Sequence, residues 1–419
     1  FSWLLFFDKD GYLGAANYFL LIILDVIIVL LNYFIYHFKS ITYAARLIVS
    51  NLTGVAICSL IFELIFGNWF QQNSIRNLWI PSNQEYKIDL KNIYPYHQQF
   101  VINIRDKYGF RGKYTSPGTI DILTVGGSTT AQAFINEGET WQDVLAEYFK
   151  LNGKDIEIVN AGVDGQSTYG HLKNFEEWFP LILNLRPKYI LYYVGLNDFF
   201  RDQDNRFDDF SLDRRINDNS LQSFKQIAKR KSVIYNLYRT YRGQYLARAY
   251  GLTHDLDYQF SMDSWTRAPL LTNHDEIMKD QIKAYKRKLY LLCEETYDFG
   301  AIPIFVTQTA RNFILEGNDV LGETESPVLH QTIEPGLKYD YNGKKYNGVD
   351  YFYMIKIMNE ATMSVANDCD AIGIDLAKDL QVKFDIYNDY YDTYHNTPTG
   401  AKKIGKYLFH ELKDRIITN

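Results

Sequence analysis

Two long apolar runs lie near the N-terminus, at residues 19–36 and 47–66. Each is close to the roughly 20 residues that an α-helix needs to cross the hydrocarbon core of a bilayer. No run of this kind recurs later in the chain. The pattern therefore predicts two transmembrane helices, at about 15–37 and 44–68, that form a membrane anchor over residues 1–69. A helical hairpin buried inside a soluble protein is the alternative interpretation.

Each predicted membrane helix contains one carboxylate, Asp25 in the first and Glu63 in the second. A carboxylate at membrane depth is costly and usually faces protein rather than lipid. We therefore expect Asp25 and Glu63 to lie between the two helices or against membrane-protein partners. An acyl or ion pathway through the membrane is the alternative.

The connection between the two helices, residues 38–46, carries Lys39 and Arg46 and no acidic residue. Short loops rich in Lys and Arg stay on the cytoplasmic side of a membrane. The chain is therefore expected in the inner (cytoplasmic) membrane of a bacterium, with its soluble body on the periplasmic or extracellular side.

Residues 70–117 are polar, contain scattered prolines and aromatic residues, and show no long periodicity. They are predicted to form a linker and an irregular collar. Within this segment, Tyr108-Gly109-Phe110-Arg111-Gly112 indicates a turn. Arg111 is interpreted as a salt-bridge residue, with a ligand contact as the alternative.

Short apolar runs alternate with amphipathic segments from residue 118 to the C-terminus. The predicted strands are residues 120–125, 156–159, 188–194, 302–307 and 372–375, and the predicted helices are residues 139–151, 168–184, 274–298, 353–368 and 399–415. The run 188–194 is apolar almost throughout, as expected of a central parallel strand that is buried on both faces. Regular alternation of strand and helix predicts an α/β fold, here a three-layer α/β/α sandwich around a parallel sheet over residues 118–419.

Two stretches interrupt this alternation, residues 201–272 and 311–352. The first contains a basic, tyrosine-rich helix candidate from Lys229 to Arg248, and the second is rich in Gly, Asp and Tyr. Both insertions leave the ends of strands, so they are placed to wall or cover a site and to set substrate choice. Packing on neighbouring proteins is the alternative.

Composition and charge limit the classes of protein to which this chain can belong. Hydrophobic residues make up 47% of the chain and charged residues 22%, so the chain can form a full core. The net charge of −6 gives no basic surface for nucleic acid. Cys58 lies in an apolar run, whereas Cys293 and Cys369 could pair in an oxidising compartment. No cysteine–histidine spacing resembles a zinc site, so neither a metal nor a cofactor is expected.

The residues that carry chemistry lie at opposite ends of the α/β region. Gly127 and Ser128 follow the first predicted strand, and Asp392 and His395 lie in a loop before the final helix. A serine hydroxyl is a weak nucleophile unless a base takes its proton, and the base needs an orienting carboxylate. Ser128, His395 and Asp392 supply these three groups, although an isolated Asp-x-x-His is usually surface decoration.

Donors for a developing oxyanion are expected at two further strand ends. The backbone N–H groups of Ser128 and Gly162 and the side-chain amide of Asn197 would converge if their loops lie side by side at the carboxyl edge of the sheet. Gly195 permits the sharp turn that presents Asn197. Asp198 is predicted to be a local cap that stabilises this turn.

These four segments resemble the sequence blocks of the SGNH (GDSL-type) hydrolase family, whose pattern is Gly-Asp-Ser, a lone Gly, Gly-x-Asn-Asp and Asp-x-x-His. In this chain the blocks are Gly126-Gly127-Ser128, Gly162, Gly195-Leu196-Asn197-Asp198 and Asp392-Thr393-Tyr394-His395. Gly127 departs from the usual aspartate. The resemblance spans about residues 118–415 and implies an SGNH hydrolase-like, flavodoxin-like fold with metal-free esterase, lipase-like or carbohydrate O-acyl transfer activity. Membrane-anchored relatives act in the acylation and deacylation of envelope polysaccharides.

The sequence thus predicts a membrane-anchored serine esterase or O-acyltransferase. Its expected substrate is an acyl ester, with acetyl favoured, on an envelope glycan or a lipid-linked molecule. The alternative is a structural or assembly subunit of a membrane complex that retains the fold. A phosphate-binding loop at Gly126–Thr130 is disfavoured because the lysine of such loops is missing.

Overall fold

The computed structural model describes residues 41–67, 75, 78, 80–90, 100–200, 232–235, 237–238, 241, 265–317, 319–324, 340–341 and 344–416. The chain divides into two compact units. One comprises Phe1–Gln72 and Leu212–Gln244, and the other comprises Asn73–Ser211 and Tyr245–Asn419. The first predicted membrane helix, with Asp25, lies outside the described residues.

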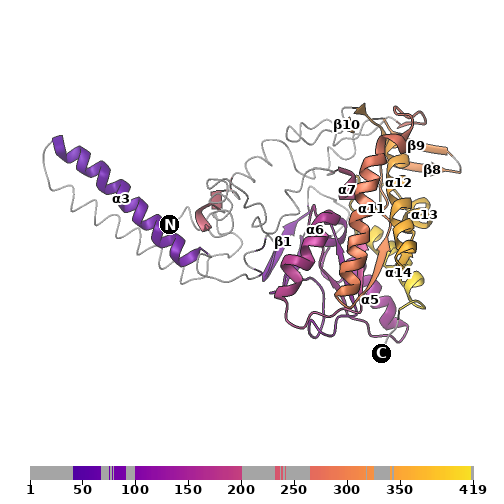
Figure 1. The fold of residues 1–419 in the computed structure, drawn as a ribbon, viewed down its shortest axis with the longest axis horizontal. Coiled ribbons are helices and arrows are strands. Elements are labelled where there is room, and N and C mark those ends of the chain that lie inside the picture. The colour runs from indigo at the N-terminus through magenta and orange to yellow at the C-terminus, as the bar shows by residue number, and fades with distance from the viewer. Residues whose placement is uncertain are drawn as a thin grey trace. The chain divides into compact units, whose positions relative to one another are not determined.

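In the first unit, helix α3 (Ile41–Phe66) corresponds to the second predicted membrane helix (Figure 1). By length and composition, Arg46–Phe66 is the one helix of the described residues that could cross a membrane. Leu52 is 65% exposed and Leu60 59% exposed, so much of the apolar surface of α3 is not covered by the protein, although Cys58 is buried. Glu63 accepts hydrogen bonds from the Ser232 hydroxyl, at 2.5 Å, and from two backbone amides that follow it.

The second unit is built on a five-stranded sheet in the order β12-β7-β5-β3-β4. All of its neighbouring strands are parallel, as the alternation predicted. The strands are β3 (Ile122–Gly126), β4 (Ile158–Asn160), β5 (Tyr189–Tyr193), β7 (Ile302–Val306) and β12 (Ile372–Ile374). Every residue of β3 and β5 is buried, which explains why these strands read as continuous apolar runs.

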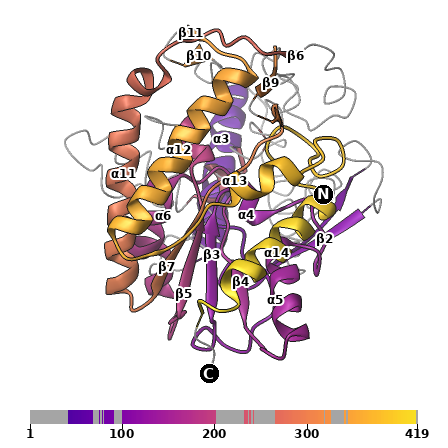
Figure 2. The same ribbon diagram turned by 90° about the vertical axis from the view of Figure 1, so that its right-hand side faces the viewer.

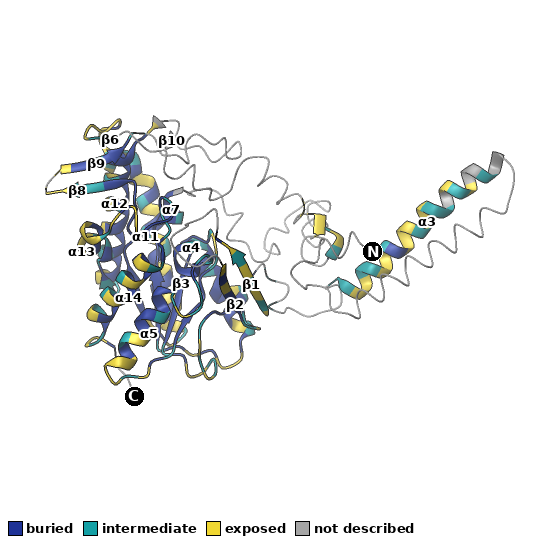
Figure 3. Ribbon diagram, turned by 180° about the vertical axis from the view of Figure 1, so that it is seen from behind, coloured by how far each residue is buried: buried dark blue, intermediate teal, exposed yellow. Residues whose placement is uncertain are grey.

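Helices cover both faces of this sheet and produce three layers (Figure 2). Alternate β5 side chains enter two separate cores: Ile190 and Tyr192 enter one, and Leu191 and Tyr193 the other. The first core is closed by α6 (Thr168–Lys173), α11 (His274–Asp298) and α12 (Gly348–Asp368). The second is closed by α5 (Trp141–Leu151), α13 (Leu376–Leu380) and α14 (Pro398–Leu412). Figure 3 shows the strands as the most deeply buried layer.

The helix boundaries follow local chemistry. Helix α5 starts at a capping box, in which Thr140 and Asp143 satisfy each other's backbone amides. The predicted helix 168–184 is instead divided into α6, a π-helical turn (Asn174–Trp178) and a 3₁₀ turn (Phe179–Leu181). Pro180 lies in the 3₁₀ turn and has no N–H to donate, so the α-helical pattern cannot continue through it.

The predicted collar contains more order than the sequence indicated. Strands β1 (Gln84–Asp89) and β2 (Phe100–Arg105) pair antiparallel. The outward side chains of β2 are apolar, with Ile104 44% exposed, while the inward Val101 is buried. The buried face of β2 also carries Asn103 and Arg105, so its alternation is inverted, with the apolar residues outward. This alternation covers only six residues, too few to show as a long periodicity.

The insertion at 311–352 contributes its own strands. Strands β8 (Phe313–Glu316) and β9 (Asp319–Glu323) form a three-stranded sheet with β6 (Trp265–Thr266), in the order β6-β9-β8. Strands β10 (Asp340–Tyr341) and β11 (Lys344–Lys345) form a short pair. In the other insertion, the described residues 233–235, 237–238 and 241 are helical, within the predicted Lys229–Arg248 helix.

One disulfide, Cys293–Cys369, joins α11 to the C-terminal end of α12, and its sequence separation is 76 residues. Cys58 in α3 is a free, buried cysteine.

Candidate active site

Ser128 begins the short helix α4 (Ser128–Ala131), after Gly126 at the end of β3 and the connecting Gly127. A Cβ on Gly126 would lie 2.0 Å from Thr130 Oγ1 and 2.8 Å from the Tyr193 carbonyl oxygen. A Cβ on Gly127 would lie 2.0 Å from Asn197 Nδ2. Gly126 is therefore required by close packing against backbone, whereas a side chain at Gly127 would displace the Asn197 amide. Gly127, where the family pattern has aspartate, leaves the space that the Asn197 amide occupies.

Ser128, His395 and Asp392 form a continuous hydrogen-bonded chain. His395 Nε2 lies 2.6 Å from Ser128 Oγ, and His395 Nδ1 lies 2.6 Å from Asp392 Oδ2. The other carboxylate oxygen of Asp392 accepts the backbone amides of Tyr394 and His395 at 2.8 and 2.7 Å. The sequence expectation that His395 lies within hydrogen-bond reach of Ser128 is met. Two residues separated by 267 positions meet because both follow the carboxyl edge of one sheet.

Neighbouring residues hold the His395 loop in place. The Arg311 amide donates to the Thr393 carbonyl at 2.9 Å, and the Tyr391 amide donates to the His395 carbonyl at 3.0 Å. The Tyr391 ring stacks on the imidazole with 8° between the planes and 5.5 Å between the centroids. The imidazole therefore has little freedom to rotate away from Ser128.

The electrostatic environment favours a protonated His395. Burial of the ring by itself lowers its pKa, but the charge and the hydrogen bond of Asp392, together with the charge of Asp164, raise it. The net effect is a His395 pKa above the ordinary 6.5. Because His395 Nδ1–H donates a hydrogen bond to Asp392 Oδ2, Nε2 of the neutral ring is the atom left to accept the Ser128 proton.

Two predicted oxyanion donors belong to Ser128 itself and to the neighbouring Asn197. The Ser128 amide donates to no group in the part of the chain that the structure describes. Asn197, near the start of α7 (Leu196–Phe200), packs its amide against Gly127 and gives one N–H to the Gln166 carbonyl at 2.9 Å. The second N–H of that amide can serve an oxyanion, because a primary amide carries two donors.

The third predicted donor, the Gly162 amide, gives its hydrogen bond to Asn160 Oδ1 at 2.8 Å in this structure. A Cβ on Gly162 would lie 2.4 Å from the Ala131 nitrogen and 2.7 Å from the Thr130 carbonyl carbon. The glycine is thus required by contact with the backbone of α4. Gly195, with a φ of +121°, makes the predicted turn before Asn197.

Asp198 has a wider role than the local cap that the sequence predicted. Its buried carboxylate accepts the Thr168 amide at 3.1 Å and the Thr168 hydroxyl, and it pairs with Lys288 at 2.9 Å. It therefore links the Asn197 turn to the start of α6 and to α11. The contacts depend on distant elements, so they are invisible in the local sequence.

Two buried glutamines that the sequence interpretation missed brace the site. Gln166 holds Asn197 through its carbonyl, and its side chain contacts His171 Nδ1 at 2.9 Å and Asn174. Burial lowers the pKa of His171 to about 4, so this imidazole is neutral and donates to the glutamine oxygen. Gln308 binds the Thr129 hydroxyl at 2.8 Å and accepts the Leu196 amide at 2.7 Å.

Gln308 could have been found from its place just after strand β7, where ligand-site residues collect. Gln166 lies in a loop several residues after strand β4, so its position in the sequence does not mark it as a site residue.

Arg111 has the structural role that the sequence favoured. Its guanidinium is buried, pairs with Glu137 at 2.6 Å and donates to the carbonyls of Ala131, Gln132 and Ile135. These bonds fix the segment that follows the nucleophile helix. Within the described residues, no cluster of three or more His, Cys, Asp or Glu side chains could hold a metal ion.

Comparison with known proteins adds an independent finding. Residues 122–408 match the family model described as GDSL-like Lipase/Acylhydrolase. This range includes the sheet and the positions of Ser128, Asn197 and His395. A comparison with curated proteins gives no match.

Several solved structures are also similar. The structure of TesA is 11% identical, with 71% of this chain and 99% of that chain covered and a TM-score of 0.38. The acetyl xylan esterase AlAXEase is 14% identical, with 70% and 98% covered and a TM-score of 0.35. The acetylxylan esterase Axe2 from Geobacillus stearothermophilus is 13% identical, with 70% and 96% covered and a TM-score of 0.38.

Proposed function

Because this chain belongs to the GDSL-like lipase/acylhydrolase family and is a serine hydrolase, we propose that Ser128, His395 and Asp392 are its catalytic triad. We further propose that it is a membrane-anchored esterase or O-acyltransferase. Its substrate would be an acyl ester, with acetyl as the expected acyl group, on an envelope glycan or a lipid-linked molecule. In this proposal residues 1–69 hold the enzyme at the membrane, 70–117 connect, and 118–419 carry catalysis.

The hydrogen-bonded chain from Ser128 through His395 to Asp392 carries this proposal. His395 Nε2 takes the hydroxyl proton as Ser128 Oγ attacks the ester carbonyl carbon. The Asp392 carboxylate stabilises the imidazolium that forms. The carbonyl oxygen becomes an oxyanion, for which the Ser128 amide and the Asn197 side chain are the proposed donors.

Collapse of this intermediate breaks the ester C–O bond, and the alcohol leaves with the proton from His395 Nε2. The acyl group is then bonded to Ser128 Oγ. A water molecule or a sugar hydroxyl attacks the acyl-enzyme, and His395 again takes and returns the proton. Water as the acceptor gives an esterase, and a hydroxyl group gives a transferase.

Two features support an extracytoplasmic location. Helix α3 has the length and composition of a membrane span, and its apolar side chains are exposed. The Cys293–Cys369 disulfide is of the kind that persists in oxidising compartments such as the periplasm or the cell exterior.

Labelling with a fluorophosphonate probe tests the nucleophile, because only an activated serine reacts. The full chain in mild detergent should be labelled and should hydrolyse p-nitrophenyl acetate. Ser128→Ala should abolish both, and Asp392→Asn should lower kcat about 10⁴-fold. Ser116→Ala, which removes a hydroxyl outside the site, is the matched control. Labelling of Ser128→Ala at the level of the unchanged protein would refute the assignment.

Membrane-protein partners at Asp25 and Glu63 remain a prediction. Glu63 already accepts hydrogen bonds from Ser232, Val233 and Ile234 of the same chain, so part of its expected contact is internal. Extraction in mild detergent followed by sizing tests the rest. A monomer under these conditions would contradict the prediction of partners.

A further inference from the structure

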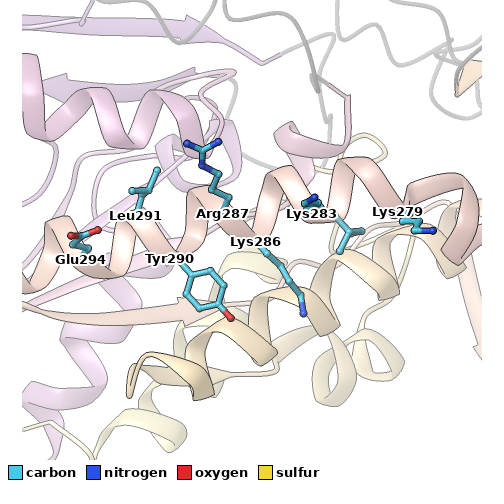
Figure 4. A pocket seen from close by; sticks show the side chains of 8 residues that line it. Lys279, Lys283, Lys286, Arg287, Tyr290, Leu291 and Glu294 are labelled. Atoms are coloured by element: carbon cyan, nitrogen blue, oxygen red, sulfur yellow. The ribbon is translucent and has the colours of Figure 1, made fainter.

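The outer face of helix α11 carries a groove whose lining includes four cationic side chains and none of the proposed triad residues. Its volume is about 540 Å³. The lining residues are Lys279, Ile282, Lys283, Lys286, Arg287, Tyr290, Leu291 and Glu294. Figure 4 shows Lys286 and Tyr290 on one side of the helix and Arg287 and Leu291 on the other. Four cationic groups against one carboxylate give the groove a positive charge, on a chain with a net charge of −6.

Among the residues that the structure describes, these cations are only weakly compensated. Lys283 and Arg287 are exposed and form no ion pair within the described part of the chain. Lys279 reaches Glu276 at 3.5 Å, but both side chains are about 70% exposed, and such pairs contribute little. Lys286 donates to the Ser364 hydroxyl at 3.1 Å, which leaves its charge unneutralised. The groove can therefore accept negative charge from outside.

The stability of α11 does not explain this arrangement. Lys279, Lys283 and Arg287 follow one another at intervals of four residues, and like charges at that spacing destabilise a helix. Asp280 precedes Lys283 by three residues, yet no ion pair joins them in the described structure. Most acids of the helix lie at its ends instead, at Asp275, Glu276, Glu294, Glu295 and Asp298. Like charges that destabilise a helix are expected where they bind a ligand of opposite charge.

The geometry favours an extended polyanion over a membrane surface. From Lys279 to Arg287 the cations extend over about 12 Å of the helix axis, at 1.5 Å per residue, which is longer than a single sugar unit. Lys and Arg bind phosphate and carboxylate groups, and the exposed Tyr290 offers a flat apolar face for a sugar ring. A helix that lies in a bilayer surface needs a broad exposed apolar face. The apolar face of α11 is instead buried in the core, through side chains such as Tyr285 and Leu289.

We propose that the groove on α11 binds an anionic glycan chain that bears phosphate or carboxylate groups. Lys279, Lys283, Lys286 and Arg287 neutralise successive anionic groups, and Tyr290 packs against a sugar ring. This site does not depend on catalysis by Ser128 and goes beyond the proposed acyl-ester chemistry. It would keep a polymeric ligand on the protein independently of turnover.

Binding is tested with the full chain in neutral detergent, in a Ser128→Ala background that removes turnover. The probes are a labelled polygalacturonate oligomer, inorganic polyphosphate and a neutral dextran oligomer. Lys283→Glu combined with Arg287→Glu should weaken binding of the anionic probes about ten-fold or more, and added salt should weaken wild-type binding steadily. Lys402→Glu combined with Lys406→Glu reverses two exposed cations at the same spacing on α14, and it should change Kd less than about three-fold.

Three results would overturn the proposal. Equal losses in the two double variants would show that only net charge matters. If neither anionic probe bound, or if dextran bound as tightly as they do, an anionic glycan would be excluded as the ligand. Binding to micelles that contain anionic phospholipid, without binding to the polymers, would assign the groove to a lipid surface. Lys283→Gln with Arg287→Gln provides the same test without charge reversal, and a thermal melt verifies that each variant is folded.

Discussion

Replacement of Gly127 by alanine tests whether the Asn197 amide stabilises the oxyanion. The new Cβ would lie 2.0 Å from Asn197 Nδ2 and 3.3 Å from its Cγ, and real contacts are longer than 3.0 Å. The amide must therefore shift by about 1 Å, a displacement that can cost a factor of about 10² in rate. The φ of Gly127 is −82°, so alanine introduces no left-handed backbone strain. The damage falls on the position of Asn197.

The expected size of the effect follows from the role of one donor. Loss of a single oxyanion-hole donor costs about 2.7–4 kcal/mol of transition-state stabilisation, or about 10²–10³ in kcat. Gly127→Ala should therefore lower kcat for p-nitrophenyl acetate at least about 10²-fold, with KM nearly unchanged. Labelling by a fluorophosphonate should persist at a reduced rate, because Ser128 and His395 remain paired.

Asn197→Ala and the double variant complete the test as a mutant cycle. If Gly127→Ala acts only through Asn197, the double variant loses no more kcat than Asn197→Ala alone. Full activity of Gly127→Ala, or losses that add in the double variant, would refute the reasoning.

Further predictions concern pH, the disulfide and the nucleophile segment. Since Asp392 and Asp164 raise the pKa of His395 and only the neutral imidazole accepts a proton, kcat/KM should fall as pH drops through a value above 6.5. Asp164→Asn should move this midpoint to lower pH and leave the plateau unchanged, as a pH–rate profile would show. Removal of the Cys293–Cys369 disulfide, which spans 76 residues, should cost about 4.5 kcal/mol in denaturant unfolding. A loss below about 1 kcal/mol would contradict that loop-entropy argument. Arg111→Met leaves the carbonyls of Ala131, Gln132 and Ile135 without their hydrogen-bond donor, so it should lower the free energy of unfolding by about 3 kcal/mol or more. Lys113→Met, at an exposed position, is the control and should have little effect.

The sheet and the outline of the site were predictable because both depend on local sequence signals. The fully buried strands β3 and β5 appear as apolar runs, and the predicted helix 274–298 has the observed bounds of α11. Strand ends in a parallel sheet meet at one edge, so Ser128 and Asn197 could be placed together without knowledge of side-chain packing.

The missed features depend on contacts between distant segments. Strand β2 is only six residues long, and it buries Asn103 and Arg105 while its apolar residues face outward. Asp198 looks like a local cap in sequence, but its partners Thr168 and Lys288 come from other helices. The contact of Gln166 with Asn197 uses a backbone carbonyl, which every residue possesses. Residue type therefore carries no information about that bond.

The distance along the chain between Ser128 and His395 has a consequence for biosynthesis. Ser128 emerges early during synthesis, but its hydrogen-bond partner His395 is 267 residues further on, in the last loop before α14. If His395 is the base, as proposed above, Ser128 stays inactive until nearly the whole domain has been made and has folded as a unit. Premature termination anywhere before His395 yields a protein without hydrolytic activity. Under this proposal, the enzyme cannot attack ester bonds around it until the chain up to His395 has been made and has folded.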